Sequence, residues 1–372
     1  MKVAYFALAP YIAGSERSLQ VLLEHATAAG VTPVVISPSD SPLLSWAKNK
    51  GIKCCAVDIN YISPKSSPLK WVLAQICLIK HLLTERVELI HSNQMWSLPS
   101  TRFVSKLLKI PVVCHLRDPI EKKNTWWLTP APDATICVSK HIERQLLASL
   151  GNKITNNITI IDPVEIPQGI ASNTSLAKLR FEAKQHFRLP LDSVILGFIG
   201  QISDVKGVCE LIETFSLLKN NNTFLLIAGK DSSPSQEYLE KCRSLISRHG
   251  LAERVTFLGF LEETKQFYHA VDLVVMYSKE EPLGLIPLEA AARYTPTLAA
   301  NVGGLPELIE HGHTGWLEDE LECSKRAINL GRIITADLSQ FGQNARLFLE
   351  RMPGPKEYAE QIVRIYHRLL SG

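Results

Sequence analysis

Two glutamates lie eight positions apart in the stretch EEPLGLIPLE, residues 280–289, on either side of an apolar run. Carboxylates accept hydrogen bonds from hydroxyl groups, so Glu281 and Glu289 are candidates for holding two hydroxyl-bearing rings. The preceding run DLVVMYS predicts a strand that ends near Ser278, followed by a loop that contains Glu281. We expect a helix from Gly284 onward, which would place Glu289 about one and a half turns into it.

The start of this expected helix suits a phosphate group. The backbone N–H groups of Gly284, Leu285 and Ile286 would be unpaired there and carry the positive end of the helix dipole. A phosphate between two hydroxyl-bearing rings describes a nucleotide sugar. Spacing alone leaves an alternative, in which Glu281 caps the helix and Glu289 is an ordinary solvated residue.

Short apolar runs alternate with helical patterns along the chain. A first series comprises KVAYFAL, TPVVIS, VELIHS, IPVVCHL, ATICVS and ITIID, and a second VILGFIG, TFLLIAG, RVTFLGF, DLVVMYS and TPTLAAN. Continuous apolar runs are typical of strands buried on both faces, so two parallel α/β sheets covered by helices are expected. Doubly wound units of this kind bind ligands at the carboxyl ends of their strands.

The chain has 372 residues, too many for one comfortable α/β core, which favours two domains. We assign residues 1–165 to an N-terminal Rossmann-like domain, and the polar stretch 166–192 to a linker. Residues 193–354 are assigned to a C-terminal Rossmann-like domain. An amphipathic helix over 355–372 is expected to pack back on the N-terminal domain.

Composition excludes several classes of protein. Apolar residues make up 46%, too many for a disordered chain, and a net charge of +3 is too small to indicate nucleic acid. The eight cysteines form no C-x-x-C pair, which favours reduced thiols in the cytoplasm over a disulfide or zinc framework. The opening MKVAYFALAP is interpreted as a buried strand rather than a signal peptide, and no apolar run reaches the roughly 20 residues of a membrane span.

Taken in order, the motifs resemble those of GT-B glycosyltransferases of the retaining family 4, the glycosyl transferases group 1. EPLGLIPLEAAA resembles the family's E-x7-E motif, and NVGGLPELIEHGHTGWL its G-G-x-P-E segment. AGSERSLQVLLEHA is similar to the glycine loop before the first helix, and GQISDVKG to the phosphate segment. VELIHSN, PVVCHLRD, ATICVSKH, LLIAGKD and VTFLGFL resemble family strands. The resemblance covers nearly the whole chain and implies two Rossmann-like domains facing across a cleft. It implies that the N-terminal domain, residues 1–165, binds the acceptor and that the C-terminal domain, residues 193–354, binds the nucleotide-sugar donor.

The resemblance also implies a role for each matching residue. Glu289 would hold the donor ribose, Glu281 the transferred sugar, and Lys206 the diphosphate. His115, expected beside the donor sugar, completes the catalytic set with Glu281 and Lys206, and a core histidine is the alternative. The nucleotide-sugar site as a whole would comprise Gly14, Ser15, Gln201, Lys206, Gly259, Phe260, Glu281, Leu283, Gly284, Leu285, Ile286 and Glu289.

Several of these residues also have an ordinary structural interpretation. The N–H groups of Gly14 and Ser15 would meet a donor or acceptor phosphate, and Ser15 would equally cap the first helix. Gln201 would donate to a phosphate or simply end a strand, and Lys206 would otherwise be an exposed lysine before a helix. Phe260 would border the base or belong to the core.

The chain departs from the family pattern at four places. Ala13 replaces the first glycine of the glycine loop, and Gln201 replaces an arginine that would pair with the diphosphate. Asp162 and Pro163 stand where the family has Asn-Gly, and Tyr277 where it has proline. The E-x7-E pair is unaffected by these changes.

The implied function is transfer of a hexose-type sugar, with retained configuration, from a UDP- or GDP-sugar to a glycan or lipid-linked acceptor in cell-surface polysaccharide or glycolipid synthesis. No cofactor and no metal are expected, because no D-x-D motif occurs and Lys206 with helix N-termini would meet the leaving-group charge. A GT-B nucleotide-sugar epimerase and a non-catalytic nucleotide-binding relative are the alternatives. A dinucleotide oxidoreductase is disfavoured because no G-x-G-x-x-G follows a strand.

The N-terminal half also contains a candidate surface for an anionic membrane. In EKKNTWWL, Lys122 and Lys123 precede Trp126 and Trp127, and tryptophan beside lysine suits a lipid headgroup layer. Residues 69–83 predict a helix that is apolar nearly all round. Further positive charge comes from Arg102, Lys106 and Lys109. We expect a cytoplasmic protein at the inner face of the membrane; the alternative is a buried helix and a tryptophan pair packed under a loop.

Overall fold

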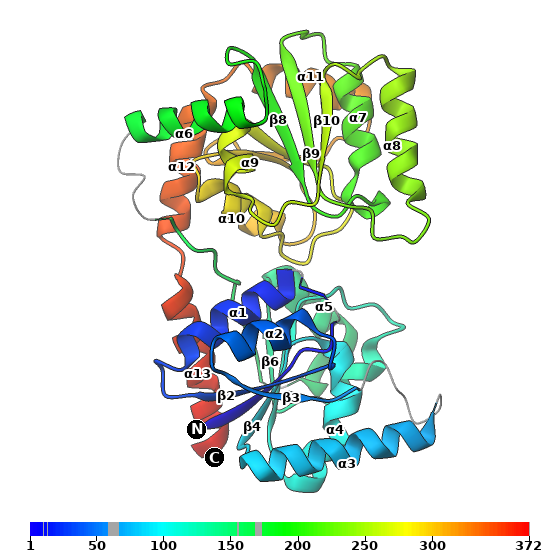
Figure 1. Ribbon diagram of the computed structural model, residues 1–372, viewed down its shortest axis with the longest axis vertical. Coiled ribbons are helices and arrows are strands. Elements are labelled where there is room, and N and C mark those ends of the chain that lie inside the picture. Colours follow the sequence, from blue (N-terminus) through cyan, green and yellow to red (C-terminus); the bar gives the residue numbers. More distant parts are fainter. Residues whose placement is uncertain (10, 13, 59–66, 155, 168–172, 372) are drawn as a thin grey trace. The chain divides into compact units, whose positions relative to one another are not determined.

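The computed structural model describes residues 1–372 except 10, 13, 59–66, 155, 168–172 and 372 (Figure 1). Ala13, which replaces a family glycine, therefore lies outside the described residues. Contacts between Cα atoms divide the chain into two compact units. The N-terminal unit comprises Met1–Pro163 and Pro353–Gly372, and the C-terminal unit comprises Val164–Met352, so the chain crosses between the units twice.

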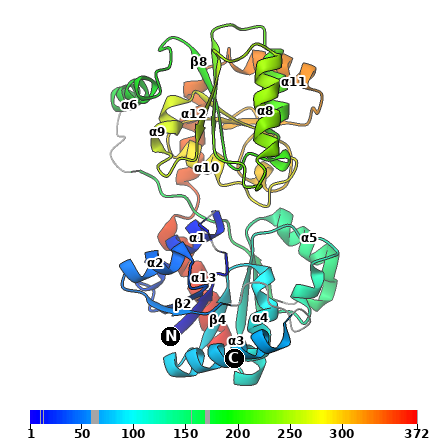
Figure 2. The same ribbon diagram turned by 45° about the vertical axis from the view of Figure 1, so that its right-hand side comes forward.

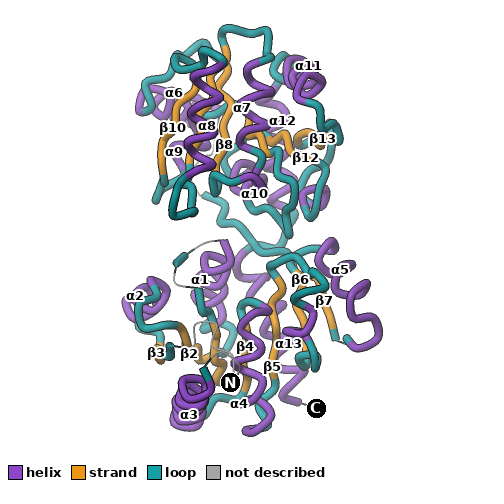
Figure 3. The backbone as a smooth tube through the Cα atoms, turned by 90° about the vertical axis from the view of Figure 1, so that its right-hand side faces the viewer, coloured by secondary structure: helices purple, strands orange, loops and turns teal. Residues whose placement is uncertain are grey.

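The N-terminal unit is built on a parallel sheet of seven strands in the order β3-β2-β1-β4-β5-β6-β7. Its strands are β1 Lys2–Phe6, β2 Thr32–Ser37, β3 Lys53–Ala56, β4 Leu89–Ser92, β5 Val112–Leu116, β6 Ala134–Cys137 and β7 Asn157–Thr159. Its helices are α1 Gly14–Ala26, α2 Pro42–Asn49, α3 Pro68–Glu85, α4 Leu98–Leu108, α5 Lys140–Leu150 and α13 Pro355–Ser371. Figure 3 shows these helices on both sides of the strands, as continuous apolar strands require.

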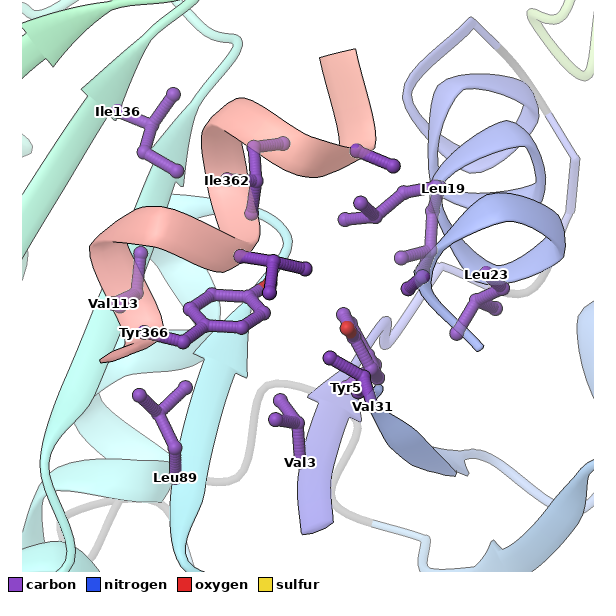
Figure 4. Packing of buried hydrophobic residues seen from close by; sticks show 14 of the residues in the cluster. Val3, Tyr5, Leu19, Leu23, Val31, Leu89, Val113, Ile136, Ile362 and Tyr366 are labelled. Carbon is purple, nitrogen blue, oxygen red and sulfur yellow. The ribbon is translucent and has the colours of Figure 1, made fainter. Parts of the chain in front are cut away.

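The C-terminal helix α13 is part of the core of the N-terminal unit. Tyr358, Ile362 and Tyr366 recur at helical spacing and are fully buried, which gives α13 one apolar face. In Figure 4, Ile362 and Tyr366 of α13 lie over the sheet, with Leu19 of α1 on the neighbouring side. The helix that the sequence indicates over 355–372 is therefore found over Pro355–Ser371, within the N-terminal unit.

The C-terminal unit repeats the plan with six parallel strands in the order β10-β9-β8-β11-β12-β13. Its strands are β8 Val194–Ile199, β9 Thr223–Ala228, β10 Val255–Gly259, β11 Leu273–Met276, β12 Thr297–Ala300 and β13 Gly315–Glu318. Its helices are α6 Asn173–His186, α7 Val208–Ser216, α8 Glu237–Arg248, α9 Lys265–Ala270, α10 Ile286–Ala291, α11 Cys323–Ile333 and α12 Leu338–Glu350 (Figure 2). The predicted fold class, two doubly wound parallel α/β units of the GT-B type, is confirmed.

The stretch 166–192, predicted to be a linker, contains the helix α6. Ala183 is buried in the core of the C-terminal unit, and Lys184 binds Asp272 with 3.1 Å between Nζ and Oδ2. The prediction of a linker over the whole stretch was wrong because α6 is polar on most of its surface and only a narrow face is buried. Residues 168–172 of the stretch lie outside the described residues.

Strand order reverses at one point in each sheet. In the N-terminal unit β1 lies beside β4, and in the C-terminal unit β8 lies beside β11. The loops that leave the carboxyl ends of two such strands diverge to opposite faces of the sheet, and ligands of doubly wound proteins bind there. The candidate residues must therefore be sought after β8 and β11 in one unit, and after β1 and β4 in the other.

Candidate functional site

The loop between β11 and α10 holds Glu281. Its side chain is only 5% exposed, and its Oε1 atom accepts a hydrogen bond from Ser278 Oγ at 3.0 Å. The same Oε1 atom lies 2.5 Å from Lys206 Nζ. Because buried carboxylates need partners, these two contacts satisfy Glu281 and fix its side chain in one position.

The helix after this loop begins later than predicted. Gly284 has a φ of 86°, in the left-handed region that favours glycine, so the helix starts at Ile286. Pro287 lies in its first turn, where a missing N–H is tolerated. Glu289 consequently belongs to the first turn, not to a position one and a half turns in. Leu283 is buried, whereas the next three residues are partly exposed.

The Gly-Gly pair of NVGGLPE supports the Glu281 loop from behind. The Gly304 N–H donates to the Glu281 carbonyl at 2.9 Å. A Cβ atom on Gly303 would lie 1.8 Å from that carbonyl oxygen, and one on Gly304 would lie 2.7 Å from the Pro282 oxygen. Only glycine permits this approach, so two motifs separated in the sequence form one structure.

Lys206 follows β8 and is held against the end of β11. It closes a short 3-10 helix, Asp204–Lys206, and the next residue, Gly207, has a φ of 68°. A Cβ atom on Gly207 would lie 2.1 Å from the Tyr277 carbonyl oxygen, so the Lys-Gly pair packs directly on the neighbouring strand end. Gln201, also after β8, is exposed to solvent. The loops at the strand-order reversal thus bring Lys206 and Glu281 together.

Glu289 has a partner that the sequence did not indicate. Tyr268, on α9, donates from its hydroxyl to Glu289 Oε2 at 2.6 Å, and its ring is fully buried. The Arg293 guanidinium lies 5.5 Å from the centre of that ring. Tyr268 therefore orients the carboxylate of Glu289, whose side chain stays partly accessible.

Gly259 ends β10 and Phe260 follows it, at the carboxyl ends of the strands of this sheet. Gly259 has a φ of 69° and closes the strand. The Phe260 ring is 57% exposed, with Lys230 Nζ 5.3 Å from its centre. The core interpretation of Phe260 is thereby excluded, and its exposed ring agrees with the alternative in which it borders a base.

In the N-terminal unit, polar side chains gather where β1 and β4 end. Ser15 Oγ donates to Glu16 Oε2 at 2.8 Å, and Gln94 Nε2 donates to Glu16 Oε1 at 2.5 Å. Asn93 Nδ2 donates to the Ser15 carbonyl at 3.2 Å. Gly14, exposed, is already the first residue of α1, so the expectation that Ser15 is the residue that caps this helix was wrong.

His115 lies inside β5 and is fully buried. Its ring packs 5.6 Å from the His91 ring and 6.5 Å from the Tyr358 ring, centre to centre. Burial, with the nearby Arg117 charge and His91, lowers the pKa of His115 well below its ordinary value, so the ring is neutral. These contacts place His115 in the core, but neither of its ring nitrogens has a hydrogen-bond partner within the described residues, so its catalytic assignment stays a prediction.

The residue that emerges where β5 ends is Arg117, two positions beyond His115. It forms a bidentate ion pair with Asp162, at 2.9 Å from Nε to Oδ2 and 3.0 Å from Nη2 to Oδ1. Tyr358 of α13 donates to Asp162 Oδ1 at 2.8 Å, and Arg117 Nη1 donates to Asn93 Oδ1 at 2.7 Å. Burial lowers the pKa of the Arg117 guanidinium, but Asp162, Tyr358 and Glu16 together outweigh burial and raise that pKa above its ordinary value.

Neither a metal centre nor a membrane span is found in the described part of the chain. Among the described side chains, no three His, Cys, Asp or Glu residues gather so that they would hold a metal ion. No described helix has both the length and the apolar character that crossing a membrane requires.

Comparison with known families matches both units. Residues 12–163 match the family model described as Glycosyltransferase Family 4, and residues 180–346 match the model described as Glycosyl transferases group 1. A curated relative, the D-inositol 3-phosphate glycosyltransferase of Mycolicibacterium gilvum, is 32% identical over 215 residues. The match covers 57% of this chain and 47% of the relative, about half the length of each.

Comparison with solved structures extends over the whole fold. HepE of Anabaena, in a complex with UDP and glucose, superposes with a TM-score of 0.85 at 21% identity, covering 99% of this chain and 100% of that one. The sucrose-phosphate synthase of Thermosynechococcus elongatus gives a TM-score of 0.82 at 19% identity, covering 100% of this chain and 99% of that one. At these identities the likeness is one of fold.

Proposed function

Because this chain belongs to the GT-B glycosyltransferases of family 4, the glycosyl transferases group 1, we propose that it transfers a hexose-type sugar from a nucleoside diphosphate sugar to an acceptor. The observation that carries the proposal is the pairing of Lys206 with Glu281 at the strand-order reversal of the C-terminal unit. There, a cation that suits a phosphate, Lys206, lies beside a carboxylate that suits a sugar hydroxyl, Glu281. Glu289 follows eight positions later with its carboxylate oriented by Tyr268.

In this proposal each group of the donor meets one of these residues. Lys206 contacts the diphosphate as a point charge, Glu281 accepts from a hydroxyl of the transferred sugar, and Glu289 accepts from the ribose hydroxyls. The donor is a UDP- or GDP-sugar. The structures of HepE in complex with UDP and glucose and with UDP-glucose support a UDP-sugar.

The proposed reaction retains the anomeric configuration. The bond between the anomeric carbon and the diphosphate oxygen breaks, and a bond from that carbon to the acceptor oxygen forms on the same face. The departing phosphate takes the acceptor proton. Lys206 stabilises the negative charge that develops on the leaving group, which is the kind of preorganised electrostatic support that lowers such barriers most.

We assign the acceptor to glycans or lipid-linked sugars of the cell surface, with the protein in the cytoplasm at the inner face of the membrane. The Trp126 side chain, 55% exposed, and the exposed Lys122 and Lys123 support this placement. Lys123 is paired with Glu121 at 2.8 Å, so Lys122 is the freer of the two cations.

The decisive experiment is incubation with a panel of labelled nucleotide sugars, with EDTA present in a parallel series. Release of nucleoside diphosphate from one donor, undiminished by EDTA, is the expected result, because Lys206 takes the place of a metal. Formation of an epimerised free donor would instead identify an epimerase. Binding of a nucleotide without turnover of any donor would identify a non-catalytic relative. Activity abolished by EDTA and restored by magnesium or manganese would refute the metal-free mechanism.

A further inference from the structure

The helix α3 has two apolar faces, and only one of them is buried. Its buried side is formed by Ala74, Gln75, Leu78 and Leu82. A second row of apolar side chains, each between 44% and 72% exposed, comprises Leu69, Val72, Leu73, Ile76 and Leu83. A helix that is apolar all round is normally buried, so an exposed apolar row of this length indicates an interaction surface.

The helix α4 continues this apolar surface. Figures 1 and 2 show α4 beside α3, and the Phe103 ring packs against the Trp71 ring with 5.3 Å between centres. Gln75 Nε2 donates to the Ser100 carbonyl at 3.1 Å, which fixes the two helices together. Phe103 and Leu107, one turn apart on α4, are 45% and 56% exposed. We call the row on α3 together with Phe103 and Leu107 the apolar face.

A pocket of about 430 Å³ opens beside α4. Arg102, Lys106 and Lys109, on successive turns of α4 and its end, line one side of the pocket. Its other side is mostly apolar and is formed by Ile110, Pro111, Pro130, Ala131, Pro132 and Leu369. Arg102 is anchored by donating to the Thr129 and Trp127 carbonyls at 2.5 Å, whereas Lys106 and Lys109 are exposed and make no ion pair within the described residues.

The charge of this surface is one-sided. Besides the three cations of the pocket, α3 presents the exposed Lys70 and Lys80. The acidic residue of α3 and α4 is Glu85, which forms ion pairs with Lys2 at 3.7 Å and with Lys53 at 3.1 Å. The pocket also contains one acid, Asp133, which accepts from the Val112 N–H at 2.7 Å, so its three cations outnumber its one carboxylate. An apolar face rimmed by an excess of cations complements an anionic lipid layer, which offers acyl chains beneath phosphates.

We propose that the pocket beside α4 binds the headgroup phosphate of an anionic phospholipid while the apolar face enters the lipid layer. Lys106 and Lys109 contact the phosphate, and Leu73 and Ile76 lie among the acyl chains. The inference rests on the membrane placement in the proposed function, and it moves the principal contact from the Trp126 loop to α3 and α4. The occupant is a bilayer surface rather than a soluble phosphate.

The test is flotation of the full chain with vesicles of phosphatidylcholine, with and without phosphatidylglycerol, at low salt. The pocket variant is Lys106→Glu/Lys109→Glu, and its matched control is Lys48→Glu/Lys153→Glu, an equal change of charge at exposed positions of the same unit. Each cation at an anionic surface strengthens binding roughly fivefold, so the pocket variant should bind the phosphatidylglycerol vesicles about 30-fold more weakly or worse. The control variant should keep most of its binding.

A second variant, Leu73→Asn/Ile76→Asn, removes apolar contact at exposed positions without changing charge, and it should also reduce flotation. Wild-type protein that does not float, or pocket and control variants that float alike, would overturn the proposal. So would calorimetric binding of free glycerol 3-phosphate in the pocket without flotation, since the site would then serve a soluble phosphate. Donor turnover is measured on the same samples, so that the two proposals can fail separately. Flotation without turnover would contradict only the proposed function, and turnover without flotation would contradict only this inference.

Discussion

Lys206 and Glu281, 75 positions apart, meet at 2.5 Å between Nζ and Oε1, so the carboxylate holds the lysine at the strand-order reversal where we propose that the donor binds. Each residue was assigned a separate part of the donor from the sequence, and the structure joins them. A bound diphosphate must therefore share Lys206 with the carboxylate.

Replacing Glu281 by alanine should spare binding of the nucleoside diphosphate and damage sugar transfer. Lys206 remains for the phosphates, while the transferred sugar loses a charge-assisted hydrogen bond worth about 1.5–3 kcal/mol, roughly 10- to 100-fold in turnover. Calorimetry with UDP and GDP is compared with turnover in the same protein, and the exposed neighbour Glu280→Ala is the control. Equal loss of both properties, or loss of neither, contradicts this division.

Replacing Glu289 by alanine should weaken nucleotide binding by at least about 10-fold, because the ribose loses charge-assisted hydrogen bonds worth roughly 1.5–3 kcal/mol each. Tyr268→Phe keeps the carboxylate but removes the hydroxyl that orients it, so a smaller loss in the same direction is expected. Calorimetry with the nucleotide that binds the wild type measures both. Unchanged affinity in Glu289→Ala would remove Glu289 from the site.

The buried pair Arg117–Asp162 should be far more sensitive to single than to double replacement. Asp162→Asn leaves a buried guanidinium without its counter-charge and should reduce the free energy of unfolding by about 3–5 kcal/mol. Arg117→Met/Asp162→Leu removes both charges and should recover most of that loss. Urea unfolding measures the three proteins. A double variant no more stable than the single one would show that the uncompensated charge of Arg117 is not the cause of the lost stability.

Acidification should destabilise the protein between pH 6.5 and pH 5. Burial first, then the Arg117 charge, lowers the pKa of His91 to about 3, and burial with Arg293 and Arg180 lowers the pKa of His269 to about 4. The unfolded chain binds protons at these histidines near pH 6.5, whereas the folded chain does not. The free energy of unfolding therefore decreases as the pH is lowered, by about 2 kcal/mol per histidine at pH 5.

Urea unfolding at pH 7 and pH 5 checks this dependence, with the exposed His249→Gln as a control that should leave it unchanged. His91→Gln should reduce the loss by about one histidine's share. The prediction is wrong if wild-type stability is the same at both pH values.

Most strands could be predicted from the sequence because they are continuous apolar runs, and the loop with Glu281 follows from where one such run ends. The strands β3 and β13 were missed because Lys53 in one and Glu318 in the other interrupt the apolar pattern. The start of α10 was missed by two residues because the left-handed Gly284 delays the helix. Arg117, two positions beyond His115, was not singled out, because its buried partner Asp162 lies 45 positions away and nothing in the sequence links the two. The hydrogen bond from Tyr268 to Glu289, 21 positions away, could not be predicted, since nothing in the sequence indicates that α9 and α10 bring these two side chains together.

The double crossing between the units has a consequence for synthesis on the ribosome. Val164–Met352 is one uninterrupted segment, so the C-terminal unit has its whole core as soon as that segment has emerged. The N-terminal unit, although made first, lacks Tyr358, Ile362 and Tyr366 until α13 has been translated, and Asp162 lacks its tyrosine partner for as long. Domains usually fold in the order of their synthesis. Here the N-terminal unit cannot complete its core until the last helix has been made, whereas the C-terminal unit can complete its core earlier.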